Sequence, residues 1–156
     1  MRIAICDDED QERLNIEALV KRYAPELSIV LFSSADELLT AAKTTFFPLI
    51  FLDIEMDDTN GFDAAEKLMS GSSQPLIVFV TKSTEYTIRG YDVAFHYLVK
   101  PLNEAKFHEV LKRALRLIIP QYFTFSSNGE LYRIPVQEIL YFESRNYMLF
   151  VHTQQQ

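Results

Sequence analysis

Three carboxylates, one hydroxyl and one ammonium group follow short apolar runs at separate places along the chain. Asp7 and Asp8 come after the first run, and Asp53 follows the third. Thr81 closes the fourth run, and Lys100 follows the fifth. The carboxyl ends of parallel strands meet at one edge of an open sheet, where ligands bind. We therefore expect these five side chains to share one rim of a sheet.

The side chains on this rim suit phosphoryl chemistry. Three clustered carboxylates repel one another unless a cation lies among them, and an oxygen-only site suits Mg²⁺ better than Zn²⁺. A Mg²⁺ ion that keeps several waters can also bind a phosphoryl oxygen, while an ammonium and a hydroxyl opposite it complete a clamp. The nucleophile left over is Asp53.

Each of these residues has a plainer interpretation when taken singly. Asp7 and Asp8 could cap the following helix, and Asp53 could form a turn. Thr81 could cap a strand end, and a lone lysine is usually a solvated surface charge. Only their conjunction favours a phosphoryl site.

The elements that must position these residues alternate between strand and helix. Five apolar runs rich in β-branched residues predict strands at residues 3–6, 29–32, 49–52, 76–80 and 97–99. Their near-continuous hydrophobicity is typical of strands covered on both faces of a parallel sheet. The intervening stretches predict helices over residues 10–23, around Leu38 and Leu39 behind a Ser34 cap with Glu37 in capping-box spacing, and over residues 62–69, 85–89 and 107–118. The expected fold class is α/β, with a doubly wound five-stranded parallel sheet.

Composition narrows the classes of function. The formal net charge of −7 argues against non-specific adhesion to nucleic acid or to anionic membranes. A single cysteine, Cys6, excludes a disulfide within the chain, and we expect it to pack in the core. No signal peptide or spanning segment is present in the sequence, so the expectation is a soluble, cytoplasmic protein.

The pattern changes after Pro120. Strand-like runs at residues 122–125, 131–134, 139–142 and 148–151 replace the helical period, and Asn128-Gly129 predicts a type I′ hairpin turn. We expect one domain over residues 1–118 and a short, incomplete all-β module over residues 119–156, which is too small to bury a core by itself.

The first of these domains resembles the receiver domain of bacterial two-component response regulators. The resemblance is carried by Asp7-Asp8, by Leu49-Ile50-Phe51-Leu52-Asp53-Ile54-Glu55-Met56 with Gly61 beyond, by Thr81, and by Tyr97-Leu98-Val99-Lys100-Pro101. It covers residues 1 to about 118 and implies a flavodoxin-like fold with strand order 2-1-3-4-5.

The same resemblance implies roles for the acidic residues. Asp53 would accept a phosphoryl group from a sensor histidine kinase, which is the expected partner. Asp8 and Asp53 would be direct Mg²⁺ ligands, Asp7 would act through metal-bound water, and the backbone carbonyl of Glu55 would be the third protein ligand.

Further roles fall on the two later strands. Thr81 would bind and sense the phosphoryl group, Lys100 would contact it, and Tyr97 would reorient together with Thr81. The Lys100-Pro101 peptide bond would be cis. On this interpretation the chain is not an enzyme beyond phosphorylation and dephosphorylation of its own Asp53.

Two positions depart from the receiver pattern. Asp57 stands where the family usually has proline, and Lys82 follows Thr81 where the family usually has a small residue. Lys82 places a bulky cation at the mouth of the expected site, so the rate of phosphoryl loss does not carry over from the family.

The tail resembles the opening part of a LytTR-type DNA-binding domain in its run Ile139-Leu140-Tyr141-Phe142-Glu143-Ser144. Only Arg145 and Asn146 fall where a DNA-contacting loop of that family belongs, and they could equally be ordinary hairpin residues. The full-length parent would bind DNA and regulate transcription, whereas this segment is expected to form a homo-oligomer through its exposed strands and not to bind DNA or a membrane.

Two alternatives stay open. A phosphohydrolase of the haloacid dehalogenase type also uses a strand-end aspartate and Mg²⁺, but it needs a second aspartate two residues later, where this chain has Glu55. The other alternative is a receiver that acts only through protein contacts.

Overall fold

The structure is a computed structural model that describes residues 1–57, 59–82 and 93–154. It divides into two compact units, Met1–Ala114 and Leu115–Gln156. This division lies inside the last helix, four residues before the boundary that the sequence predicts after residue 118. The two units are described separately below.

The first unit is built on a parallel sheet with the strand order β2-β1-β3-β4-β5. Its strands are β1 (Arg2–Cys6), β2 (Ser28–Phe32), β3 (Leu49–Leu52), β4 (Leu76–Thr81) and β5 (His96–Val99). All five predicted strands and their order are confirmed. The strands β1 and β3 are almost wholly buried, as continuous apolar runs require in a sheet covered on both faces.

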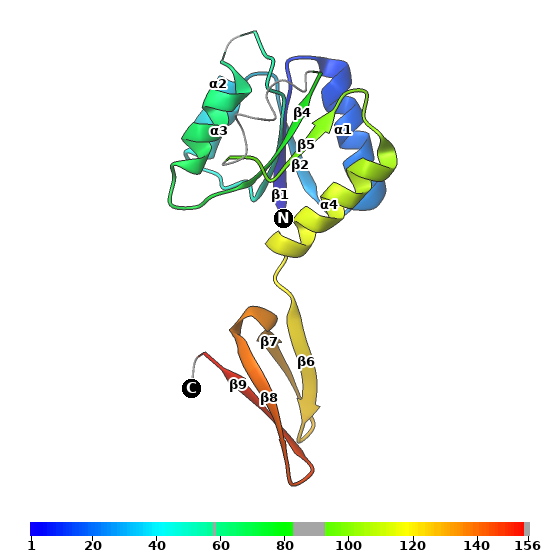
Figure 1. Cartoon of the computed structure of the whole chain (residues 1–156), viewed down its shortest axis with the longest axis vertical. Coiled ribbons are helices and arrows are strands. Elements are labelled where there is room, and N and C mark those ends of the chain that lie inside the picture. The colour runs from blue at the N-terminus through cyan, green and yellow to red at the C-terminus, as the bar shows by residue number, and fades with distance from the viewer. Residues whose placement is uncertain (58, 83–92, 155–156) are drawn as a thin grey trace. The chain divides into compact units, whose positions relative to one another are not determined.

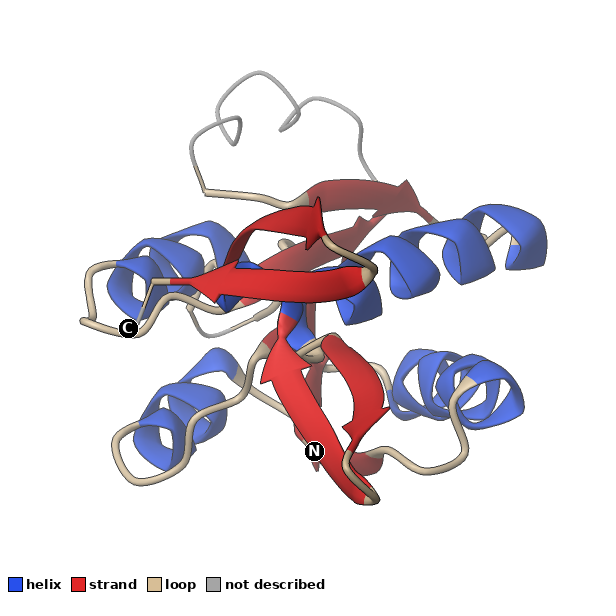
Figure 2. Ribbon diagram, turned by 90° about the horizontal axis from the view of Figure 1, so that it is seen from below, coloured by secondary structure: helices blue, strands red, loops and turns tan. Residues whose placement is uncertain are grey.

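Helices cover both faces of this sheet. Figures 1 and 2 show α1 (Asp10–Tyr23) and α4 (Glu104–Ile118) on one face, and α2 (Ala35–Ala42) and α3 (Gly61–Met69) on the other. These four helices were expected from the sequence. The fifth predicted helix, at residues 85–89, lies outside the described residues.

Local capping explains where α2 and α3 begin. The Ser34 hydroxyl accepts a hydrogen bond from the Glu37 N–H at 3.2 Å, and the Asn60 side chain accepts one from the Phe62 N–H at 2.8 Å. The capping-box prediction was wrong in one detail. The Glu37 carboxylate accepts its hydrogen bonds from the N–H and hydroxyl of Ser33, one residue earlier than the expected partner Ser34.

The core fills both sides of the sheet. Between the sheet and helices α2 and α3, buried side chains pack around Leu52, Ile77 and Phe79. On the other face, Phe51 of β3 stacks on Phe107 of α4 with ring centroids 5.2 Å apart. Cys6 is buried, as expected, and burial together with the nearby Asp7 charge raises the pKa of its thiol to about 12. The thiol therefore stays protonated at neutral pH.

The second unit consists of two antiparallel hairpins. The first pairs β6 (Tyr122–Ser127) with β7 (Glu130–Pro135), and the second pairs β8 (Ile139–Arg145) with β9 (Met148–Thr153). Asn128 and Gly129 have φ angles of 53° and 82°. Positive φ at both central residues is what a type I′ turn requires, so the predicted turn is confirmed.

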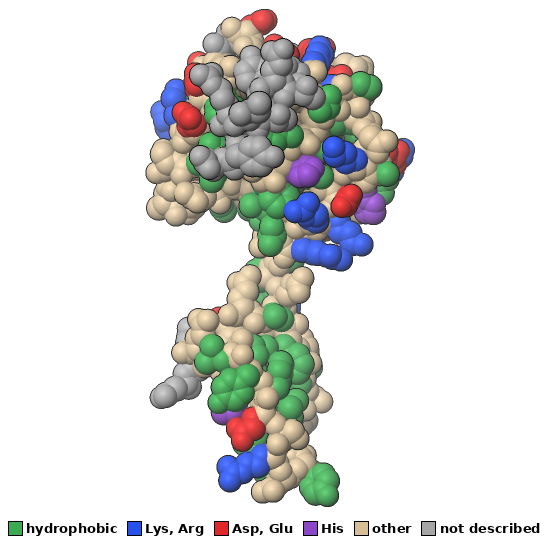
Figure 3. All heavy atoms as spheres, viewed as in Figure 1, with side chains coloured by type: hydrophobic (Ala, Val, Ile, Leu, Met, Phe, Trp, Pro, Cys, Tyr) green, Lys and Arg blue, Asp and Glu red, His purple; other side chains and the backbone are tan. Residues whose placement is uncertain are grey.

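Many large apolar side chains of this unit are exposed. Leu131 is 70% exposed and Tyr147 is fully exposed. Each of the four strands carries at least one exposed large apolar side chain. Figure 3 shows such side chains gathered on one face of the hairpins. In the described part of the chain, no helix has the length and apolar character to cross a membrane.

Candidate functional site

The structure brings the predicted residues together at the carboxyl end of the sheet. Asp7, Asp53, Thr81 and Lys100 are all buried there, whereas Asp8 is exposed. One carboxylate oxygen from each of Asp7, Asp8 and Asp53 lies within 4.8 Å of the other two. The rim is therefore a compact acidic cluster in which Asp7 and Asp53 are buried and Asp8 is exposed to solvent.

Lys100 bridges the two buried carboxylates. Its Nζ donates to Asp7 Oδ2 and to Asp53 Oδ2, each at 2.7 Å. The other oxygen of each carboxylate accepts a backbone N–H: Asp7 Oδ1 from Glu9 at 2.9 Å, and Asp53 Oδ1 from Glu55 at 3.1 Å. One ammonium thus serves two buried anions, and the orientation of both carboxylates is fixed.

Burial and charge pairing compete in setting the pKa values of Asp53 and Lys100. Burial raises the pKa of Asp53 above its ordinary 3.8, and Lys100 offsets that effect only in part because Asp7 adds a second negative charge. Burial alone would lower the pKa of Lys100, but hydrogen bonds and charge from Asp53 and Asp7 outweigh it and raise the pKa above 10.5. Lys100 is therefore charged at neutral pH, and burial makes the ionised form of Asp53 less stable than it would be in water.

The backbone around Asp53 is tightly fixed. Asp53 donates its N–H to the Cys6 carbonyl at 2.9 Å, which continues the β1–β3 ladder into the site. Gly61 donates its N–H to the Ile54 carbonyl at 3.0 Å and so closes the loop after Asp53. A Cβ atom on Gly61 would lie 1.9 Å from the Asp53 carbonyl oxygen, so only glycine fits there.

Thr81 and Tyr97 lie on neighbouring strands. In the β4–β5 register, Thr81 pairs with Val99 and Phe79 pairs with Tyr97, so Tyr97 and Thr81 project from the same face two positions apart. The Tyr97 ring packs against Phe79 with centroids 5.2 Å apart. The Tyr97 hydroxyl is buried and has no hydrogen-bond partner among the described residues, and burial raises its pKa. The expected cis bond between Lys100 and Pro101 is present.

The two departures from the receiver pattern are both exposed and follow β3 and β4. Asp57 is exposed in the loop after Asp53. Lys82 is also exposed, and its Nζ forms an ion pair with Glu9.

The predicted DNA-contacting residues lie at a hairpin tip. Arg145 ends β8 and Asn146 begins the turn, where Asn146 and Tyr147 have φ angles of 50° and 62°. This is a second tight turn of the kind found at Asn128-Gly129. The geometry suits a hairpin, and their role in DNA binding stays a prediction.

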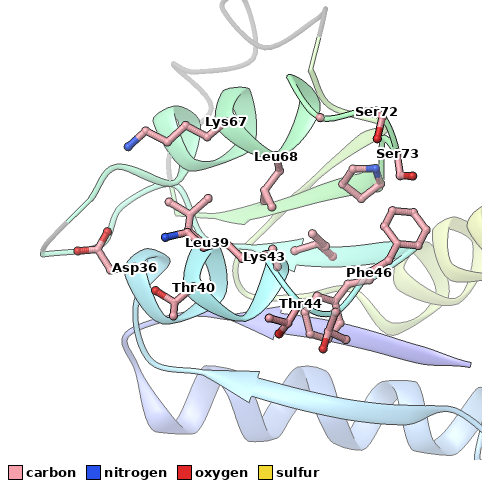
Figure 4. Close-up of a pocket in the computed structure, with 16 residues that line it drawn as sticks. Asp36, Leu39, Thr40, Lys43, Thr44, Phe46, Lys67, Leu68, Ser72 and Ser73 are labelled. Atoms are coloured by element: carbon pink, nitrogen blue, oxygen red, sulfur yellow. The ribbon is translucent and has the colours of Figure 1, made fainter.

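A separate hollow of about 890 Å³ lies beside α2 and α3. Figure 4 shows Leu39, Lys43, Phe46, Lys67 and Leu68 among the side chains that line it. The hollow is lined by residues 45–47, which precede β3, and by residues 71–73 and 75, which precede β4, so it lies toward the amino ends of these strands. None of the predicted site residues lines it.

The acidic cluster, its bridging lysine and the strand order agree with a comparison to known families. The family model described as "Response regulator receiver domain" matches residues 3–112, which is more than half of the chain. The chain belongs to the response regulator receiver family. As a receiver it is a signalling protein, and an acidic Mg²⁺ pocket of the kind seen here is typical of the family.

Curated relatives include response regulators of the LytT type. The chain is 33% identical over 115 residues to the sensory transduction protein LytT of Enterococcus faecalis, which covers 73% of this chain and 48% of that protein. It is 30% identical over 158 residues to an uncharacterised response regulatory protein of Yersinia pestis, which covers 92% of this chain and 66% of the relative. The chain thus spans about half the length of the LytT relatives.

Solved structures share the fold of the first unit. The response regulatory domain of mrkE from Klebsiella pneumoniae superposes with a TM-score of 0.71 at 24% identity, over 75% of this chain and 97% of that one. The chemotaxis protein CheY4 of Vibrio cholerae gives a TM-score of 0.65 at 24% identity, over 73% and 98%. Both likenesses support the flavodoxin-like receiver fold.

Sequence reasoning missed one participant at this rim. No role at the site was expected for Glu9, yet its carboxylate contacts Lys82. The available signal was the expected strand order, which places the loops after β1 and β4 on either side of β3.

Proposed function

We propose that Asp53 accepts a phosphoryl group from a sensor histidine kinase in a Mg²⁺-dependent reaction. The observation that carries this proposal is the Lys100 bridge between two buried carboxylates, with exposed Asp8 completing the cluster. A buried aspartate that is held in place, partly desolvated and next to a cation is suited to attack phosphorus.

The donor set fits Mg²⁺. Three carboxylates and no nitrogen or sulfur donor form the cluster, which is the chemistry that hard divalent cations prefer. Asp8 and Asp53 are the proposed direct ligands, with the Glu55 carbonyl as the third. Asp7 is proposed to act indirectly, through metal-bound water; its side chain is fully buried, whereas Asp8 is exposed. When bound, the cation would neutralise phosphoryl oxygens.

The chain's own residues account for the rest of the transfer. A carboxylate oxygen of Asp53 forms the new bond to phosphorus as the bond between phosphorus and the donor's leaving group breaks, and the leaving group departs with that electron pair. Lys100, already hydrogen-bonded to Asp53, is placed to neutralise one phosphoryl oxygen. Hydrolysis of the resulting acyl phosphate by water would release inorganic phosphate and return Asp53 to its carboxylate form.

The switch residues follow from the same geometry. We propose that Thr81 donates its hydroxyl to the phosphoryl group and that Tyr97 changes orientation with it. The shared sheet face supports this coupling. The Tyr97 hydroxyl supports it as well: it is buried without a hydrogen-bond partner among the described residues, and leaving a buried hydroxyl unpaired costs free energy.

The output of the switch is proposed from the relatives and the hairpins. LytT is named a sensory transduction protein, and the tail resembles the opening part of a LytTR-type DNA-binding domain, so the proposed output is transcription control by DNA binding. Arg145 and Asn146 are the DNA contacts proposed in this segment. Cytoplasmic placement stays a prediction.

Phosphoryl labelling tests the proposed function. We expect acetyl phosphate with Mg²⁺ to add one phosphoryl group to the protein, as measured by intact mass. Excess chelator should abolish the addition, because three carboxylates offset by only one bridging ammonium, Lys100, repel the donor dianion. Reduction with borohydride followed by peptide mapping should place the group on Asp53. Undiminished labelling in excess chelator would contradict the proposal.

We also propose that the chain associates with a second copy through its hairpins. Exposed apolar residues such as Leu140 and Leu149, on strands with free edges, favour pairing with another chain. Light scattering should show a mass that rises with concentration, and the double variant Leu140→Glu with Leu149→Glu should stay monomeric. Leu14→Glu, at an exposed leucine of α1, is the matched control and should associate like the wild type. A monomeric wild type would contradict this proposal.

A further inference from the structure

Two side chains of opposite charge, Glu9 and Lys82, follow the strands on either side of β3. In the sheet order β2-β1-β3-β4-β5, β3 lies between β1 and β4. Glu9 lies in the loop after β1, and Lys82 directly follows β4. Neighbouring strands are about 4.8 Å apart, so an ion pair between these two loops must cross the end of β3. Asp53 is the residue immediately after β3.

Glu9 directs its carboxylate to Lys82, although its position would also allow it to cap helix α1. It occupies the N-cap position of α1, but its side chain makes no capping hydrogen bond. A carboxylate at a helix N-terminus can stabilise the helix by accepting hydrogen bonds from its first N–H groups. Glu9 instead directs its carboxylate to Lys82. The Glu9 N–H donates to Asp7 at 2.9 Å, which fixes this residue to the acidic cluster.

The pair is close to the cluster yet easy to open. Hydrogen bonding to Glu9 raises the pKa of Lys82, and the Asp53 carboxylate acts in the same direction, so Lys82 and Asp53 are within electrostatic reach. The side chains of Lys82 and Glu9 are 58% and 48% exposed. An exposed pair of this kind contributes little net stability, because water competes for both charges.

We propose that the Glu9–Lys82 pair is a strap across the mouth of the Asp53 site, and that Lys82 exchanges Glu9 for a phosphoryl oxygen when the donor enters. The inference rests on the proposed function and adds Lys82 and Glu9 as positioning residues for it. The incoming phosphoryl group carries close to two negative charges at neutral pH, more than the single charge of Glu9. The exchange moves no proton and forms no covalent bond, and Glu9 is left in water.

A double-mutant cycle on the labelling rate tests the strap. Glu9→Gln releases Lys82, so labelling by acetyl phosphate with Mg²⁺ should be about two- to fivefold faster, the range that corresponds to one exposed ion pair. Lys82→Met keeps the length of the side chain and removes the charge, so labelling should slow by a similar factor. In the Lys82→Met background, Glu9→Gln should raise the labelling rate no more than the charge control Asp57→Asn does, because Glu9 acts through Lys82.

Asp57→Asn is the matched control for charge alone. It removes one exposed carboxylate from the neighbouring loop without touching the strap. If Glu9→Gln speeds labelling equally with and without Lys82, or no more than Asp57→Asn does, Glu9 acts only by its charge and the strap is overturned while phosphorylation of Asp53 stands. If the wild type itself takes no phosphoryl group, the proposed function fails and the strap fails with it.

Discussion

Asp53→Asn should abolish phosphoryl labelling completely and, at the same time, make the protein more stable at neutral pH. The loss of labelling follows because the asparagine amide is not a nucleophile toward phosphorus and Asp53 is the proposed phosphoacceptor. Intact mass after incubation with acetyl phosphate and Mg²⁺ measures it. Asp57→Asn, which removes an exposed carboxylate four residues later, should label like the wild type.

The gain in stability follows from the raised pKa of Asp53. Because the folded pKa lies above the ordinary 3.8, the native state binds more protons than the unfolded state between those two values. The free energy of unfolding therefore falls as pH rises through that window, and the wild type carries the whole penalty at neutral pH. Asparagine carries none and can still accept a hydrogen bond from Lys100.

The stability difference between Asp53→Asn and the wild type should consequently depend on pH. It should be largest at neutral pH, shrink as pH falls through the folded pKa of Asp53, and vanish below about 3.8. Denaturant unfolding without Mg²⁺ measures it. A wild type more stable than Asp53→Asn at pH 7 would show that Lys100 more than offsets the burial of the carboxylate.

Gly61→Ala should destabilise the first unit by about 2 to 3 kcal/mol, the cost of forcing an extra carbon into a closed site. The new Cβ would lie 1.9 Å from the Asp53 carbonyl oxygen and 3.0 Å from Ile54 Cα, both backbone atoms that cannot turn away. The loop after Asp53 must therefore shift, and we expect labelling to slow together with the loss of stability. Urea unfolding and the labelling rate measure the two effects.

Gly71→Ala is the matched control. Its Cβ would lie 3.6 Å from the nearest atom, the Leu68 carbonyl oxygen, which is an ordinary contact. Stability and labelling should stay close to the wild-type values. Equal behaviour of the Gly61 and Gly71 variants would mean that the backbone approach at Asp53 is not as close as the structure has it.

Much of the fold could be predicted from the sequence because it depends on local patterns. The apolar runs from Ile3 to Cys6 and from Leu49 to Leu52 are continuous, and this pattern is typical of strands that are covered on both faces. Ser34 and Asn60 cap their helices through bonds to residues two or three positions away. Asn128-Gly129 carries its turn type in two residues.

The acidic rim could also be predicted, because strand ends in a parallel sheet gather at one edge. Asp7, Asp53 and Lys100 were expected to meet there, and they do. The departures at Asp57 and Lys82 were also visible in the sequence, because the receiver family usually has proline and a small residue at these positions.

Tertiary structure alone decided how the charges at that rim are shared. Lys100 contacts both Asp7 and Asp53, and Glu9 contacts Lys82, so each of these ion pairs joins residues far apart in the chain. The close approach of Gly61 to the Asp53 carbonyl depends on how the loop after β3 folds back. Such contacts depend on strand order, register and side-chain direction together. Periodicity and capping constrain only neighbours along the chain, so they place a side chain at an edge of the sheet without determining which partner it meets there.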